Sequence, residues 1–270
     1  MSSIILLVFE GERTEPDIFN SIEKHFFDVS SGKTILRSSF KGEIYQLWKR
    51  IKDDEYFDTI ELIKERDESI KDINRKQVSE IHLFFDHDAH SHMDSMPQAE
   101  YDKILFGMLN TFGDENELGK LWISYPMVEA IKHCKKNPND CFKDGAVKIS
   151  ENTKYKDLVG HITDFQNIKK INRGDWIYLI AINMQRAYCL IMNDYKLIDD
   201  YNEIKAWFEN NTTIRIIIHE KQIEKFINPK SEVAVLSPFP FFLLNYFGNP
   251  LFNEVKALDI IKNCSFYCFW

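Results

Sequence analysis

The chain has 270 residues, of which 44% are hydrophobic and 28% charged, the balance of a soluble globular protein with one large domain or two modest ones. Its net charge of −8 counts against a protein that coats nucleic acid through a broad basic surface. A nuclease is not excluded, because the side chains that hold a metal ion are themselves acidic.

No apolar run approaches the roughly 18 residues that are needed to cross a membrane. The N-terminus lacks the basic start of a signal peptide, and its apolar run leads straight into Glu10. The five cysteines show neither a disulfide framework nor a zinc-binding spacing, which is typical of buried, reduced thiols. We therefore expect a cytoplasmic protein.

In the first half of the chain, short apolar runs alternate with stretches of helical spacing. Residues 4–9 form a continuous apolar run, which is typical of a buried parallel strand. Thr14 is expected to cap the helix that follows, with Pro16 in its first turn. Strands are predicted at residues 4–9, 34–40, 80–85 and 121–123. Helices are predicted at residues 14–26, 44–51, 97–112 and from about 127, with an exposed helical insertion at 56–74. This order predicts an α/β fold, a parallel sheet flanked by helices.

The second half of the chain is expected to be mainly helical. Residues 137–152 are rich in Asn, Asp and Lys and are the best candidate boundary, so we predict domains at 1–136 and 153–270. Further helices are predicted at residues 155–171, 176–193 and 201–210, while 214–218 fits either a strand or part of a buried helix. The apolar stretch 238–247 either packs inside this region or forms a docking surface for a partner or a second copy, as in a homodimer.

Acidic residues directly follow two of the predicted strands. Glu10 follows the strand at 4–9, and Asp86 and Asp88 follow the strand at 80–85. Ligands of parallel sheets bind beyond the carboxyl ends of the strands, so these side chains are expected to meet at one edge. Crowded carboxylates repel one another, and a divalent cation keeps them ionised. Oxygen ligands suit Mg²⁺ or Mn²⁺, and such an ion can activate water and polarise a phosphoryl oxygen.

These motifs carry a resemblance to a known family. The sequence EGERTEP at residues 10–16, followed by Asp86-His87-Asp88 after a later strand, resembles a TOPRIM domain. That domain occurs in topoisomerases, primases and nucleases of the overcoming-lysogenization-defect (OLD) type. The EG-x-x-TEP form is similar to stand-alone TOPRIM effectors of bacterial anti-phage systems, including the effector of PARIS. The resemblance covers roughly residues 1–135 and is faint beyond them.

The resemblance implies a TOPRIM-like sheet and a magnesium-dependent endonuclease. Asp86 and Asp88 match the family's metal-holding DxD motif, and Glu10 matches the first-strand glutamate, a metal ligand or general base. Ser124 and Glu129 are candidates for further acidic and serine positions of OLD-type nucleases, with Glu129 at a second ion. Their spacing departs from that pattern.

The resemblance also implies a biological setting. The chain would be the toxic effector of an anti-phage defence system, acting by abortive infection and held inactive by an ATPase sensor protein. Its substrate would be RNA, such as transfer RNA, or DNA. No GxxxxGK[ST] run exists in the chain, so a nucleotide switch would lie in the partner. The alternative is a non-catalytic subunit, in which the TOPRIM scaffold only binds or regulates a partner.

Neighbouring residues allow other interpretations. His87, His90 and His92 could bind zinc, but the HxHxDH order of metallo-β-lactamases is absent. In the favoured interpretation His87 points away from the metal, because alternate residues of a strand face opposite sides. A phosphatase of the haloacid dehalogenase type also places DxD after a strand, but near the N-terminus and before a Thr.

Three other side chains near the predicted site have two possible roles each. Glu15 either lines the site or caps the first helix. Lys132 and Lys136 would share one face of a helix, where they either steady a phosphate or remain solvated.

Overall fold

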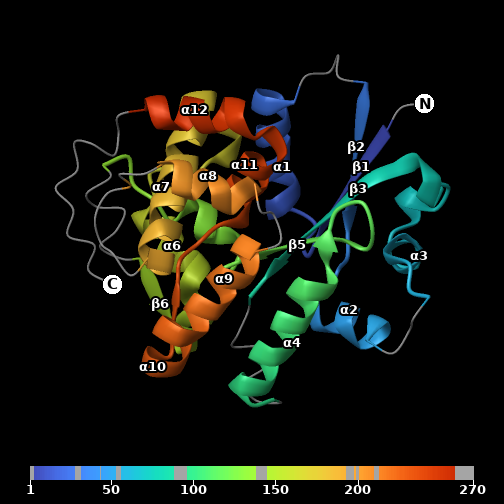
Figure 1. Cartoon of the computed structure of the whole chain (residues 1–270), viewed down its shortest axis with the longest axis horizontal. Coiled ribbons are helices and arrows are strands. Elements are labelled where there is room, and N and C mark those ends of the chain that lie inside the picture. The colour runs from blue at the N-terminus through green and yellow to red at the C-terminus, as the bar shows by residue number, and fades with distance from the viewer. Residues whose placement is uncertain are drawn as a thin grey trace.

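The computed structural model describes residues 3–27, 32–42, 44–52, 56–87, 96–137, 145–192, 198, 201–209 and 213–258. Its centre is a five-stranded sheet with the strand order β2-β1-β3-β5-β4 (Figure 1). The strands are β1 (Ser3–Phe9), β2 (Lys33–Ser39), β3 (Val78–Asp86), β4 (Gly113–Asp114) and β5 (Gly119–Ser124). β2, β1, β3 and β5 are parallel, and β4 pairs antiparallel with β5. The predicted α/β class, a parallel sheet flanked by helices with a mainly helical C-terminal region, is confirmed.

Most of the helices that apolar spacing predicts are present in the structure, with similar bounds. The α-helices are α1 (Thr14–Phe26), α2 (Ile44–Ile51), α3 (Thr59–Lys64), α4 (Gln98–Thr111), α6 (Tyr155–Ile162), α7 (Arg173–Met192), α8 (Tyr201–Glu209), α9 (Thr213–Gln222), α10 (Asn228–Lys230), α11 (Pro238–Phe247) and α12 (Asn249–Ala257). The short helix η4 (Val128–Lys132) follows β5. None of the helices that the structure describes is long and apolar enough to cross a membrane.

Helices cover both faces of the sheet. On one face Phe19 of α1 contacts Phe9 of β1, with ring centroids 6.2 Å apart, and α11 packs against β5. On the other face α4 packs against β5, and Trp48 of α2 lies beside Gly107 of α4. Residues of β3 alternate between the two faces, as strand geometry requires. All of β1 from Ile4 onward is buried, which explains its continuous apolar run.

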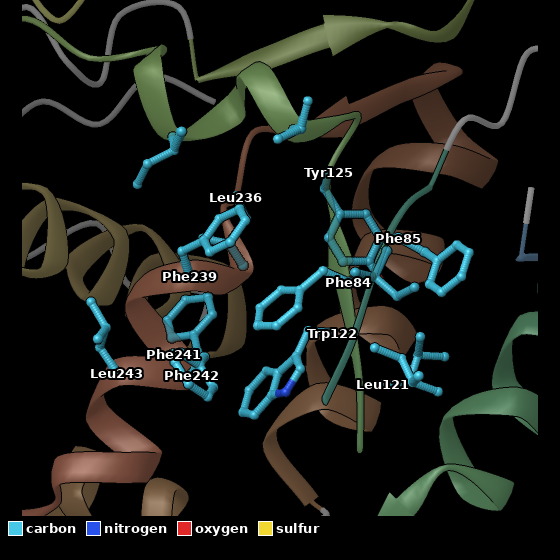
Figure 2. Close-up of a cluster of buried hydrophobic side chains, with 14 of the residues drawn as sticks. Phe84, Phe85, Leu121, Trp122, Tyr125, Leu236, Phe239, Phe241, Phe242 and Leu243 are labelled. Atoms are coloured by element: carbon cyan, nitrogen blue, oxygen red, sulfur yellow. The ribbon is translucent and has the colours of Figure 1, made fainter. Parts of the chain in front are cut away.

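The apolar core is continuous between the sheet and the C-terminal helices (Figure 2). The ring of Phe84 in β3 stacks on Phe239 of α11 at 4.9 Å and meets Phe242 edge-on at 5.5 Å. Trp122 of β5 also meets Phe242 edge-on, at 6.0 Å. The apolar stretch 238–247 thus packs largely inside the protein. The core crosses the boundary expected near residues 137–152, and the division into two domains stays a prediction.

Several local expectations differ from the structure. Residues 214–218 lie in helix α9, so the strand alternative is wrong. Thr14 is the first residue of α1; the cap position belongs to Arg13, which makes no side-chain capping bond. The insertion at 56–74 contains α3, which buries Ile60 and Ile63 and is therefore amphipathic rather than simply exposed. A small antiparallel sheet of β6 (Ala146–Lys148) and β7 (Glu232–Ala234) was not expected.

Candidate functional site

The ends of β1 and β3 bring Glu10 and Asp86 into contact. The two strands are neighbours in register, with Phe9 opposite Phe84, so the residues that follow them lie at the same edge. The backbone N–H of Asp86 donates a hydrogen bond to Oε2 of Glu10 at 2.9 Å, and the N–H of Glu10 donates to the carbonyl of Phe84 at 3.1 Å. The expected meeting of these two strand ends is therefore present. Asp88 lies outside the described residues, as do His90 and His92.

Two further carboxylates lie at this edge, Glu15 and Glu129. Glu15 is buried in the first turn of α1, where its Oε1 accepts a hydrogen bond from the N–H of Gly11 at 3.0 Å. Glu129 is buried on η4, the short helix after β5. Both are close enough to Asp86 to raise the pKa of its carboxyl group by charge repulsion. We refer to Glu10, Glu15, Asp86 and Glu129 as the acidic cluster.

The pKa of Asp86 is raised well above its ordinary value. Removal from water is the largest cause, followed by repulsion from Glu10 and Glu15, while a hydrogen bond from the backbone N–H of Val128 opposes the shift. Burial also raises the pKa of Glu15, and Glu129 adds to that shift. The cluster therefore favours any bound positive charge, either a proton or a metal cation.

The segment after β5 completes this edge of the sheet. Ser124 is the register partner of Asp86 and is buried. Tyr125 then exchanges two backbone hydrogen bonds of 2.9 Å with Leu236, and its hydroxyl lies 3.3 Å from Nδ1 of His219. Elements from the second half of the chain therefore hold the backbone that carries Val128 and Glu129. The helix expected from about residue 127 is the short 3₁₀ helix η4, which carries Glu129.

The lysines near Glu129 are arranged differently from the expectation. η4 ends at Lys132, so Lys132 and Lys136 do not share a helix face, and that expectation is wrong. The backbone N–H of Lys136 donates to Asp164 at 2.8 Å, and its ammonium lies 3.9 Å from Asp175. A lysine that was not singled out from the sequence, Lys156 of α6, reaches the cluster instead, with Nζ 3.8 Å from Oε1 of Glu129.

His87 lies on the face of the sheet that α4 covers. It is fully buried, and its ring centroid is 5.6 Å from that of Tyr101 and 5.1 Å from that of Tyr125. Asp86, the preceding residue, faces the acidic cluster. This placement agrees with the expectation that His87 points away from a metal bound by its neighbours.

The chemistry of the acidic cluster suits a hard divalent cation, because its donors are all carboxylate oxygens. Glu10 and Asp86 are in contact, and Glu15 and Glu129 stand near enough to perturb them. Within the described ranges, no three Asp, Glu, His or Cys side chains are grouped as ligands of a single ion. The described residues thus supply Glu10 and Asp86 as candidate ligands, and the third candidate that the sequence suggests, Asp88, lies outside them.

Comparisons with protein-family models, with curated proteins and with solved structures found no match to this chain. The family resemblance therefore depends on the motifs at residues 10–16 and 86–88.

The raised pKa of Asp86 predicts how stability changes with pH. The folded protein keeps the Asp86 proton above pH 3.8, where an ordinary Asp loses it, so ionisation opposes folding. In chelator, the free energy of unfolding should fall as pH rises from about 4 through the raised pKa. Asp86→Asn should remove that part of the fall, because an amide does not ionise. Urea denaturation at a series of pH values measures the slope of unfolding free energy against pH for the unaltered protein and for Asp86→Asn. Identical slopes would contradict a raised pKa at Asp86.

Proposed function

We propose that the chain is a metal-dependent endonuclease of the TOPRIM type, which cleaves phosphodiester bonds of nucleic acid. The observation that carries this proposal is the contact between Glu10 and Asp86 at the carboxyl edge of the parallel sheet. These are two of the three residues that match the acidic motifs of TOPRIM nucleases. Substrates of parallel α/β sheets bind at this edge.

The residues of the site have distinct roles in this proposal. Asp86 and Glu10 would hold a Mg²⁺ or Mn²⁺ ion together with Asp88, and Glu129 is the candidate for a second ion. When bound, such an ion activates water and neutralises charge on the phosphate. The chain itself presets the geometry: the N–H of Asp86 orients the Glu10 carboxylate, and the N–H of Val128 orients that of Asp86. Such preorganisation lowers the cost of assembling the site.

The wider setting of the proposal follows from the family resemblance. The chain would act as the toxic effector of an antiviral defence system, and an ATPase sensor protein would control it. Transfer RNA is the favoured substrate and DNA the other candidate. The net charge of −8 supports a dependence on metal or on a partner for substrate binding, because a broad basic surface would be needed otherwise.

The test is incubation of the purified full chain with transfer RNA or with plasmid DNA, in Mg²⁺, in Mn²⁺ or in chelator. We expect cleavage of at least one substrate in the presence of metal and none in chelator. The same reactions are repeated with an ATPase sensor protein of the kind that the resemblance implies, because such a sensor would release the activity. Absence of cleavage in every arm would overturn the proposal.

A non-catalytic scaffold is the second candidate function. A subunit of this kind would keep its partner binding and its effect in cells when Glu10 and Asp86 are replaced by their amides. The nuclease would lose cleavage and toxicity while remaining folded.

A further inference from the structure

Lys156 introduces a positive charge into the acidic cluster from the second half of the chain. Its Nζ lies 3.8 Å from Oε1 of Glu129. The Glu129 side chain is only 8% exposed, whereas that of Lys156 is 73% exposed. A solvent-facing ammonium therefore lies against a nearly covered carboxylate. The influence of Lys156 extends beyond this pair, because its charge also opposes the rise in the pKa of Glu15.

The backbone of Lys156 is fixed where the side chain can reach the cluster. The preceding residue, Tyr155, is fully buried, and its hydroxyl lies 2.9 Å from Nδ1 of His133. Tyr155 packs in a small apolar cluster with Ala130 of η4 and Val159 of α6. Helix α6 is thereby docked on the helix that carries Glu129, and the long, flexible side chain of Lys156 extends from this rigid base.

We propose that Lys156 is a built-in counter-cation of the acidic cluster, and that a divalent ion binding there must displace it from Glu129 or bind against its charge. This inference rests on the proposed metal-dependent function and adds a regulatory element to it. Fully ionised, the four carboxylates carry four negative charges, and Lys156 offsets one of them. The Lys156 side chain is exposed and its Nζ stands 3.8 Å from the carboxylate oxygen, so the ammonium is held weakly and can swing away when a doubly charged ion arrives.

A regulatory consequence follows from the position of α6. The counter-charge comes from the mainly helical region, whereas Glu10, Glu15 and Asp86 come from the first part of the chain. Any partner that moves α6 relative to η4 would change the metal affinity of the site without touching a ligand. The helical region would then set the metal concentration at which the site fills.

The test compares metal binding by the full-length protein with that of three variants. Lys156→Gln removes the charge, Lys156→Arg keeps it, and Lys154→Gln makes the same charge change at an exposed position of the same segment. Affinity for Mn²⁺ is measured by calorimetry and by the metal-dependent rise in melting temperature, so that no readout depends on cleavage. We expect Lys156→Gln to bind Mn²⁺ about three- to tenfold more tightly, as removal of one nearby like charge predicts. Lys156→Arg and Lys154→Gln should stay within about twofold of the unaltered protein.

The possible outcomes separate this inference from the proposed function. If the unaltered protein binds Mn²⁺ clearly and Lys156→Gln binds it equally or more weakly, the role of Lys156 as a counter-cation is overturned. The proposed metal site is not affected by that result. A similar gain in Lys154→Gln also overturns it, because the effect would then reflect net charge alone. Absence of Mn²⁺ binding in all four proteins overturns both the inference and the metal-dependent function on which it rests.

Discussion

Asp86→Asn is expected to lower metal-dependent cleavage by at least about a hundredfold while leaving the protein folded. The amide keeps the size of the side chain but removes the charge that would hold the ion, and loss of groups that merely orient metal ligands already costs about 10–100-fold. Stability should not fall, because the pKa of the Asp86 carboxyl is raised and its ionised form opposes folding. At neutral pH we therefore expect activity to fall while stability holds or rises, a trade-off that is common at functional sites.

Cleavage rates and melting temperatures of three variants check this expectation. Glu10→Gln should behave like Asp86→Asn, since its carboxylate contacts the same strand end. Glu117→Gln is the matched control, because Glu117 is exposed at the opposite end of β5 and should retain full activity. Magnesium should raise the melting temperature of the control but not of the two site variants, because only an ion that binds the folded state stabilises it. Full cleavage by Asp86→Asn would exclude the proposed site.

Phe84→Ala is expected to lower the free energy of unfolding by about 3–5 kcal/mol, the usual cost of truncating a buried Phe. Phe84 is 1% exposed, and its ring lies between β3 and α11 in contact with Phe239 and Phe242. The cavity would open at the junction of the sheet and the C-terminal helices. Because one apolar core spans this junction, we expect the sheet and the helices to unfold together.

Urea denaturation followed by tryptophan fluorescence tests this cooperativity. Single-tryptophan versions report on each half, with Trp122 in β5 for the sheet and Trp176 in α7 for the helices. Both probes should give the same midpoint, and Phe84→Ala should shift the two equally. Phe106→Ala is the control, because Phe106 is 39% exposed on α4 and its loss should cost less than about 1 kcal/mol. Two separate transitions would instead support independent domains at 1–136 and 153–270.

The meeting of Glu10 with Asp86 could be predicted from the sequence for a simple reason. Glu10 and Asp86 each end a run of apolar residues, and parallel strands that share an edge place such residues side by side. The position of His87 was also predictable, because side chains alternate along a strand. Glu15 was harder to assign, since a glutamate in the first turn of a helix can either line the site or cap the helix. In the structure it is buried near Glu129 and Asp86 and also accepts a hydrogen bond from the N–H of Gly11 just before α1, so both roles stay predictions.

What the sequence by itself determined is the α/β class, most of its strands and helices, and the meeting of Glu10 with Asp86. These follow from local periodicity and from strand direction, which are properties of short segments. Only the tertiary structure decided that α11 closes the core over Phe84, that Leu236 holds the segment after β5, and that Lys156 lies against Glu129. Those contacts join residues 27 to 155 positions apart, and no local pattern in the chain encodes which distant surfaces will pack together.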